Sequence, residues 1–442
     1  MGLFSPAQQS AVLAAAERTK NLAAQKPAAT KSASSLKSQL TKISNEVQEY
    51  FKDSQAILIT SKAELHDYVT KAIASGSFAI DTETTGLDRI NDWIVGVSLY
   101  YKGGVECYIP IKHIVPIFDV PYKNQLTYEE VGEELQRFVD AGTKAILANV
   151  DFDAAMIYKD MHVDIMLIFW YDVILAWRCI KENELHKDLK RLYNKYVLKG
   201  AGDPKRFSDF FPPALFPYCK PEIARLYAAH DAIITFELCE WQLPYVTKGH
   251  PKCTRHHFDL IADLIWNVEF PLATACQAMH RRGFYIDKAV SNEIKRKYLP
   301  EMEAEVNKVK TMVADVLSDS RYATKVKRPF ARPQDFNPNS PPHVEWLVYD
   351  WLKLGDGSTR STKKEVLGTY NHPIIKQLLY CRSLSTLIGT FVVKLPNVIA
   401  PDGRIHCQFK QIGADTGRMS SADPKQAYWG HKIKLIQGRA TA

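Results

Sequence analysis

Carboxylates at the end of a β-rich run are the first residues in this sequence whose types and spacing could do chemistry. The run at 77–81 ends in Asp81, and Glu83 follows two positions later. Because side chains two apart on a strand face the same side, Asp81 and Glu83 are expected to point together. Adjacent carboxylates repel each other unless a cation lies between them, and oxygen ligands suit hard divalent cations. The pattern predicts a metal site at a strand end, where α/β sheets hold ligands, although alone it is most often a surface turn.

Two further acidic elements follow in the chain. Asn149 and Asp153 come after the apolar run 145–147, and Tyr227 and Asp231 lie within a helical pattern. Residues four apart share one helical face, so Tyr227 and Asp231 can address one site. Each element alone has a simpler explanation: Asn149 as a helix N-cap, and the second pair as a solvated helical face. Together, in this order and spacing, the three elements favour one catalytic site.

The elements that must position these residues indicate an α/β domain. Short β-rich runs occur at 56–60, 77–81, 93–100, 105–111 and 145–147, and a helical pattern covers 128–139. Strands first, then strands mixed with helices, predict a mixed sheet. The apolar run 165–177 is interrupted by Asp172 and reads as a buried helix that is too short to span a bilayer.

The rest of the chain is predicted to be mostly helical. Helical periodicity occurs at 184–198, 221–242, 258–282, 291–317, 341–354, 363–369 and 372–389, and a strand is expected at 403–409. By contrast, residues 1–54 are rich in Ala, Ser, Lys and Gln with few aromatic residues, which predicts a flexible, weakly basic arm.

Composition narrows the class of protein. The 442 residues carry a formal net charge of +8, which suits a polyanionic partner without requiring one. The eight cysteines form no CxxC pair, so neither a zinc ribbon nor a redox motif is expected, and reduced thiols are typical of the cytosol. No secretory signal or membrane span is predicted. We expect a cytoplasmic protein of a bacterium or an infected host cell.

The three acidic elements resemble the exonuclease motifs of the DEDD superfamily. They read DTETTGLD at 81–88, NVDFD at 149–153 and YAAHD at 227–231. The tyrosine marks the subtype with tyrosine in its third motif. The sequences YAAHDAIITFEL and LHKDLKRLYNKYV are also similar to the proofreading domain of bacterial DNA polymerase I and its phage relatives. The resemblance implies an RNase H-like fold and 3′→5′ exonuclease action on DNA.

The resemblance also implies a two-metal mechanism with Mg²⁺ or Mn²⁺. Asp81 would bridge the two ions, and Glu83 and Asp231 would complete the shell of the first. Asp153 would hold the second ion, and Tyr227 would orient the attacking water.

Four residues are expected to contact the DNA. The same resemblance implies contacts with the 3′-terminal nucleotide of a single strand for Thr82, Leu87 and Asn149. Hydrolysis would release deoxynucleoside 5′-monophosphates, and fraying costs least at a mismatch, which would give editing selectivity. Arg418 would reach the primer end of a primer–template duplex.

The second half resembles the polymerase region of family A DNA polymerases. The matching stretches are 269–272, 280–287, 334–337, 361–367, 381–384, 394–396, 403–406 and 416–424, the last reading TGRMSSADP. The basic segment 288–332 is expected to grip duplex phosphates, as a polymerase thumb does. The predicted domains are an arm at 1–54, an exonuclease domain at 55–245, a mostly helical thumb at 257–400, the start of the palm with its first strand at 401–424, and a divergent tail at 425–442.

The resemblance stops after residue 424. No counterpart of the palm carboxylates or the fingers helix follows, so polymerisation is expected to be absent from this chain alone. We hypothesise a truncation by frameshift, an intervening sequence, or a split gene with palm and fingers on a separate chain. The alternatives are an RNA-processing DEDD exonuclease, which the thumb and TGRMSS element disfavour, and a non-catalytic DNA-binding remnant, which would have no need to keep the carboxylates.

Overall fold

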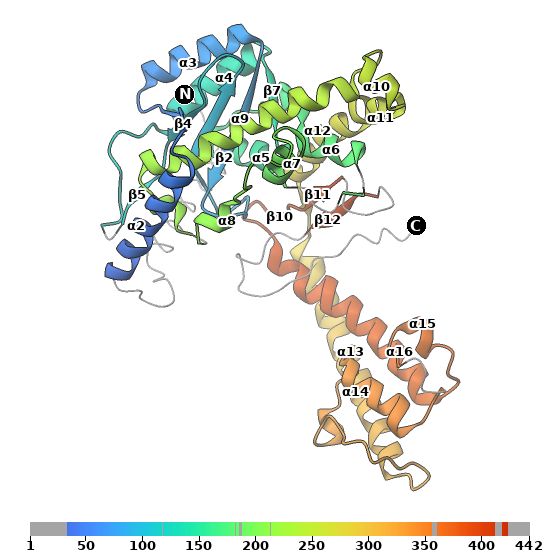
Figure 1. Ribbon diagram of the computed structural model, residues 1–442. Helices are drawn as coiled ribbons and strands as arrows, with labels where there is room; N and C mark the ends of the chain where they lie inside the picture. Colours follow the sequence, from blue (N-terminus) through green and yellow to red (C-terminus); the bar gives the residue numbers. More distant parts are fainter. Residues whose placement is uncertain are drawn as a thin grey trace. The chain divides into compact units, whose positions relative to one another are not determined.

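The computed structural model describes residues 33–422 except 117, 182, 185–187, 213, 356–359 and 412–417 (Figure 1). Two compact units make up this part of the chain. The first contains the described residues up to Arg282 together with those from Cys407 onward, and the second contains Gly283–His406.

A six-stranded mixed sheet forms the centre of the first unit. Its strand order is β1 (Ile57–Leu58), β4 (Cys107–Pro110), β3 (Ile94–Tyr101), β2 (Ser77–Thr84), β7 (Lys144–Leu147) and β8 (Phe169–Asp172). The β2–β3 and β3–β4 pairs are antiparallel, whereas β1–β4, β2–β7 and β7–β8 are parallel. The predicted α/β class with a mixed sheet is therefore confirmed.

Strand β2 alternates between the two faces of this sheet. Phe78 and Ile80 belong to a core formed with α3 (Lys62–Ser75), α4 (Tyr128–Asp140) and α5 (Val150–Met161). Ala79 belongs to the other core.

That second core contains residues of α6 (Val173–Ile180) and α9 (Pro221–Val246). Because the side-chain period of a strand is two, Asp81 and Glu83 share the face of Ala79, toward α9. Thr82 shares the opposite face, toward α5. Strand β2 extends three residues beyond the run at 77–81, so both carboxylates lie within the strand.

Residues 33–50 form a helix, α2 (Ala33–Tyr50), and not the predicted flexible arm. Ile43 and Val47 on α2, and Phe51 just after it, are buried in a core that also contains Phe210 and Tyr227. Ile43, Val47 and Phe51 recur every four positions, which places them on one helical face. This short apolar stripe, and not the overall composition, decides the structure here. Residues 1–32 of the predicted arm lie outside the described residues.

The run 165–177 is not one helix. It forms a 3₁₀ turn, η1 (Ile165–Leu167), then strand β8, then the start of α6. Asp172 ends β8, and its side chain accepts hydrogen bonds from the backbone N–H groups of Val150, Ile174 and Leu175. A short apolar run cannot be assigned to a strand or a helix from periodicity alone, which explains the wrong prediction.

The second unit is mostly helical, as predicted. Its elements include α13 (Lys288–Ser318), α14 (Pro341–Glu345), η5 (Trp346–Trp351), α15 (Lys364–Leu367), α16 (Pro373–Thr386) and η6 (Leu387–Lys394). Val309 and Val313 of α13 pack in one core with Leu347, Ile374 and Leu378.

The predicted strand at 403–409 is instead two short strands with different partners. β10 (Arg404–Ile405) pairs with β9 (Phe284–Tyr285), and β11 (Gln408–Lys410) pairs with β12 (Ser420–Ala422). Residues 416 and 417 of the TGRMSS element and the tail from 423 lie outside the described residues. Among the described helices, none combines the length and apolar character that crossing a membrane requires.

Candidate active site

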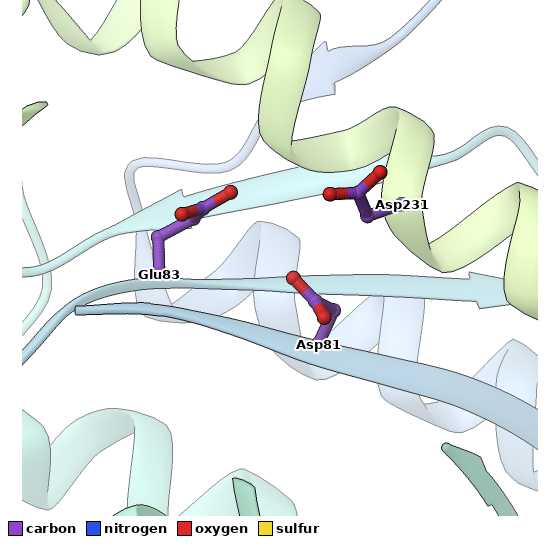
Figure 2. Close-up of side chains that lie close together, drawn as sticks. All are labelled: Asp81, Glu83 and Asp231. Atoms are coloured by element: carbon purple, nitrogen blue, oxygen red, sulfur yellow. The ribbon is translucent and has the colours of Figure 1, made fainter. Parts of the chain in front are cut away.

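Three carboxylates from two elements converge on the α9 face of the sheet. Asp81 and Glu83 extend from β2 and Asp231 extends from α9, as Figure 2 shows. One oxygen of each lies within 4.8 Å of the others, and no other group of three His, Cys, Asp or Glu side chains in the described part of the chain has such a geometry. The structure thus brings together three of the four acidic residues that the sequence predicts for the metal site.

Helix α9 lies close to the strands because its inner face carries small residues. Ala228, Ala229 and Ala232 are buried and flank the position of Asp231. Tyr227 lies one turn earlier on the same helix, as the spacing of four predicts. The strand period and the helix period together place the third carboxylate over the first two.

Burial and mutual repulsion dominate the electrostatics. Burial raises the pKa of Asp81 well above its usual value, and the neighbouring charges of Asp153, Asp231 and Glu83 raise it further. Burial, followed by the charge of Asp231, raises the pKa of Glu83 to about 8. The free protein at neutral pH therefore holds protons in this group, which a bound cation would displace.

The donor set fits a hard divalent cation. It consists of carboxylate oxygens only, and such ligands suit Mg²⁺ and Mn²⁺. The Asp231 Oδ1 atom is buried and accepts no hydrogen bond of normal geometry, although the Lys190 ammonium lies 3.1 Å from it. Buried carboxylates of like charge are stable as anions only beside positive charge, so the geometry supports a metal site without identifying the metal.

Asp153 lies on the other side of β2 from this group. It is carried by α5, and its Oδ1 accepts hydrogen bonds from the Thr82 hydroxyl at 2.5 Å and the Thr82 N–H at 3.2 Å. Burial raises the pKa of Asp153 to about 7, while the bonds from Thr82 act in the opposite direction. The charge of Asp153 is nevertheless close enough to raise the pKa of Asp81. Its expected role at a second ion remains a prediction.

Tyr227 is buried in a ring of aromatic side chains. Its ring contacts Phe51, Phe207, Phe210 and Phe211, with centroids 5.3–6.1 Å apart. Burial, with the nearby charge of Asp231, raises the pKa of the Tyr227 phenol well above its usual value. The hydroxyl therefore keeps its proton throughout the neutral range.

Lys190 is a residue of this site that the sequence prediction missed. It lies on α7 (Leu189–Tyr196), and its Nζ is 3.1 Å from Asp231 Oδ1. The same ammonium donates a hydrogen bond to the Tyr227 hydroxyl and lies 3.6 Å from the centroid of its ring. The segment LHKDLKRLYNKYV contains the signal, but a sequence does not show which of its basic residues turns inward.

Asp151, two residues before Asp153, anchors α5. Its carboxylate pairs with Arg89 at 2.5 Å and accepts hydrogen bonds from Gln277 at 2.9 Å and Gln408 at 3.0 Å. Gln408 lies on β11, far along the chain. These three contacts hold the first turn of α5, the helix that carries Asp153, against other parts of the chain.

The remaining predicted substrate residues can be placed individually. Leu87 is 59% exposed, and Asn149 and Arg418 are also exposed. Asn149 occupies the N-cap position of α5 in a left-handed conformation with φ of 70°, and its side chain makes no capping hydrogen bond. Asp172 caps the Val150 N–H instead. The Asn149 side-chain amide therefore does not cap α5. Contact of Leu87, Asn149 and Arg418 with DNA stays a prediction.

Two protein families match separate parts of the chain. Residues 56–241 match the family described as 3′-5′ exonuclease, and residues 306–427 match the family described as DNA polymerase family A. The carboxylates of the cluster lie within the first match, Gln408 and Arg418 lie within the second, and α2 lies before both.

The curated relatives are distant and longer. DNA polymerase I of Pseudomonas aeruginosa is 25% identical over 83% of this chain and 38% of its own length, and the DNA polymerase of Escherichia phage T5 is 25% identical over 82% and 42%. The thermostable DNA polymerase I of Thermus aquaticus is 34% identical over 36% of this chain and 18% of its own. The chain thus spans about two fifths of the length of the first two.

A solved structure shares the fold. It is the POL domain of Pol1 from M. smegmatis in complex with DNA primer-template and dNTP, with a TM-score of 0.59 and 15% identity. The likeness covers 83% of this chain and 54% of that one.

Proposed function

We propose that this chain, which carries a 3′-5′ exonuclease domain followed by part of a family A DNA polymerase domain, removes nucleotides one at a time from the 3′ ends of DNA. The observation that carries the proposal is the convergence of Asp81, Glu83 and Asp231 inside the exonuclease match. The match names a reaction class, and the carboxylate group supplies the chemistry that the reaction needs.

Asp81, Glu83 and Asp231 would hold one divalent ion, and Asp153 would contribute to a second. Such ions activate water and stabilise the leaving 3′ oxygen of a phosphodiester when they are bound. The protein itself fixes the carboxylates on a strand and a packed helix, so that little reorganisation is needed.

Tyr227 is suited to orient the attacking water. Its hydroxyl accepts a hydrogen bond from Lys190, so its own proton remains available for donation to a water molecule. The raised pKa of the phenol keeps that proton in place at the pH of a cell. The four phenylalanine side chains packed around Tyr227 restrict its side chain to one position.

The proposed substrate is the single-stranded 3′ end of a primer–template. A mismatched end frays at lower cost than a paired end, which would make the reaction a proofreading step in DNA replication. The exposed Leu87, Asn149 and Arg418 are proposed to contact the DNA.

The deciding experiment follows degradation of a 5′-labelled single-stranded DNA, with an RNA of the same sequence in parallel. Wild type should shorten the DNA stepwise with Mg²⁺ or Mn²⁺ and not with EDTA, and Asp81→Asn should abolish shortening. Asp119→Asn, a change of an exposed carboxylate outside the cluster, is the matched control and should remain active.

Three results would contradict the proposal. Faster degradation of RNA would favour an RNA-processing enzyme. Tight DNA binding by a folded, metal-supplied protein that leaves the strand intact would favour a binding remnant. Equal activity in Asp81→Asn would show that the carboxylate group is not the site.

A further inference from the structure

The ammonium group of Lys190 lies where a positive charge acts on the whole carboxylate group. Its Nζ is 3.1 Å from Asp231 Oδ1, and it also lowers the pKa values of Asp81 and Glu83 through its charge. The Lys190 side chain is only 11% exposed and that of Asp231 14%. In such surroundings water screens the pair weakly, so the attraction is much stronger than between exposed groups.

Lys190 contacts both residues of the third acidic element. It pairs with Asp231, and it also donates a hydrogen bond to the Tyr227 hydroxyl while lying over the Tyr227 ring. Three different interactions of one ammonium thus fix the relative positions of a proposed metal ligand and the proposed water-orienting group. A pair that served only to join α7 to α9 would need none of the contacts with Tyr227.

We propose that Lys190 is an internal counter-ion, which holds Asp231 and Tyr227 in place when no metal is bound and competes with the metal for Asp231. This inference rests on the proposed function, because it assumes that the carboxylates bind a divalent cation. An ammonium 3.1 Å from Asp231 Oδ1 and a divalent cation bound to the same carboxylate would repel each other. In this proposal, metal binding displaces the Lys190 side chain, which its flexible four-carbon stem permits.

A counter-ion and a purely structural ion pair predict opposite changes in metal affinity. If Lys190 competes with the metal, its removal leaves a more negative site and tightens metal binding. If Lys190 only supports the fold, its removal loosens the site, and metal binding becomes weaker or stays the same. Metal affinity therefore separates the two roles without relying on catalysis.

The experiment measures Mn²⁺ binding to the full chain by isothermal titration calorimetry, without DNA, at pH 8. Lys190→Met keeps the apolar stem and removes the charge, and we expect it to bind Mn²⁺ on the order of tenfold more tightly. Lys190→Arg retains the charge and should bind like wild type. Without metal, Lys190→Met should also melt at a lower temperature than wild type, and saturating Mn²⁺ should remove the difference.

Lys195→Met is the matched control. Lys195 lies on the same helix and pairs with Glu184 at 2.6 Å, but its side chain is 56% exposed. The same charge is lost in both variants, so a general electrostatic effect would appear in both. We expect the Mn²⁺ affinity of Lys195→Met to stay within twofold of wild type. Should Lys190→Met fail to fold, Lys190→Gln, which retains a donor for Tyr227, replaces it.

The outcomes distinguish this inference from the proposed function. If wild type binds Mn²⁺ and Lys190→Met binds it with equal or weaker affinity, the counter-ion role is overturned. The exonuclease proposal is unaffected by that result. A folded wild type that binds no Mn²⁺, with no gain in Lys190→Met, overturns both.

Discussion

Thr82 holds Asp153 by two hydrogen bonds to one carboxylate oxygen, from its hydroxyl at 2.5 Å and its backbone N–H at 3.2 Å. Because Thr82 faces away from Asp81 and Glu83, these bonds keep Asp153 on the α5 side of β2. Asp153 therefore lies on one face of β2, whereas Asp81 and Glu83 lie on the other. Thr82, between Asp81 and Glu83 in the strand, links the two sides because its side chain and N–H bind Asp153.

Thr82→Val should destabilise the metal-free protein by about 1–2 kcal/mol at pH 9, because a buried carboxylate loses its hydroxyl donor. The pKa of Asp153 is about 7, so the carboxyl is mostly protonated at pH 5 and the loss should be smaller there. Urea unfolding at the two pH values measures the difference. Thr84→Val removes a hydroxyl bond to the Gly86 carbonyl and should cost the same at both pH values. An equal penalty for Thr82→Val at both would contradict the prediction.

The metal-free protein should lose stability as the pH rises from about 5 to about 8. The pKa of Glu83 is about 8 and that of Asp153 about 7, against ordinary values of 4.5 and 3.8. The folded state therefore binds more protons than the unfolded state within this window, so the free energy of unfolding falls with rising pH. Thermal melts in EDTA measure the slope, and Glu83→Gln should reduce it.

Divalent metal should reverse this pH dependence. Deprotonated carboxylates bind cations, so Mg²⁺ should raise the melting temperature more at pH 8 than at pH 5. The comparison uses the same protein at fixed ionic strength, with NaCl replacing MgCl₂ in the control. An equal shift at both pH values would show that the buried carboxylates are not the ligands.

Asp231→Asn should lower the exonuclease rate by more than ~100-fold, since removing even a second-sphere partner of a metal ligand costs about 10- to 100-fold. The amide keeps the shape and removes the charge, so the fold should be preserved. Asp119→Asn changes an exposed acidic residue outside the cluster and is expected to stay within a few-fold of wild type. Stepwise shortening of a labelled strand measures both, and an active Asp231→Asn would count against the site.

Phe51→Ala should destabilise the protein by about 3–5 kcal/mol and lower kcat more than it changes KM. The ring of Phe51 meets that of Tyr227 edge-on at 6.1 Å, so its loss removes one wall around the tyrosine. Ile43→Ala empties a buried position on the same side of α2 and should lower stability without the specific loss of kcat. Phe51→Leu should restore part of the rate. Equal kcat values in Phe51→Ala and Ile43→Ala would refute the positioning role.

Periodicity was sufficient to predict the centre of the site. A strand repeat of two places Asp81 beside Glu83, and the structure confirms this pairing and the mixed sheet. A helix repeat of four places Tyr227 and Asp231 on one face, where Lys190 contacts both of them. These relations are local, so they can be read from spacing alone.

Relations between distant segments could not be predicted in this way. Lys190 and Arg191 are adjacent in one basic helix, and only the packing of α7 on α9 decides that Lys190 meets Asp231. Likewise, the choice of Thr82 as the partner of Asp153 depends on how α5 crosses the sheet. The stripe that buries Phe51 was present in the sequence, but the polar composition around it obscured the signal.

The position of α2 bears on how this protein could be recombined with its relatives. The exonuclease match begins at residue 56, whereas the aromatic wall behind Tyr227 includes Phe51. A chimera joined at the start of the match would inherit every carboxylate and lose that wall, leaving apolar side chains of α9 open to water. A junction placed before residue 33 would transfer the helix with the site, so the transferable module is larger than its family signature.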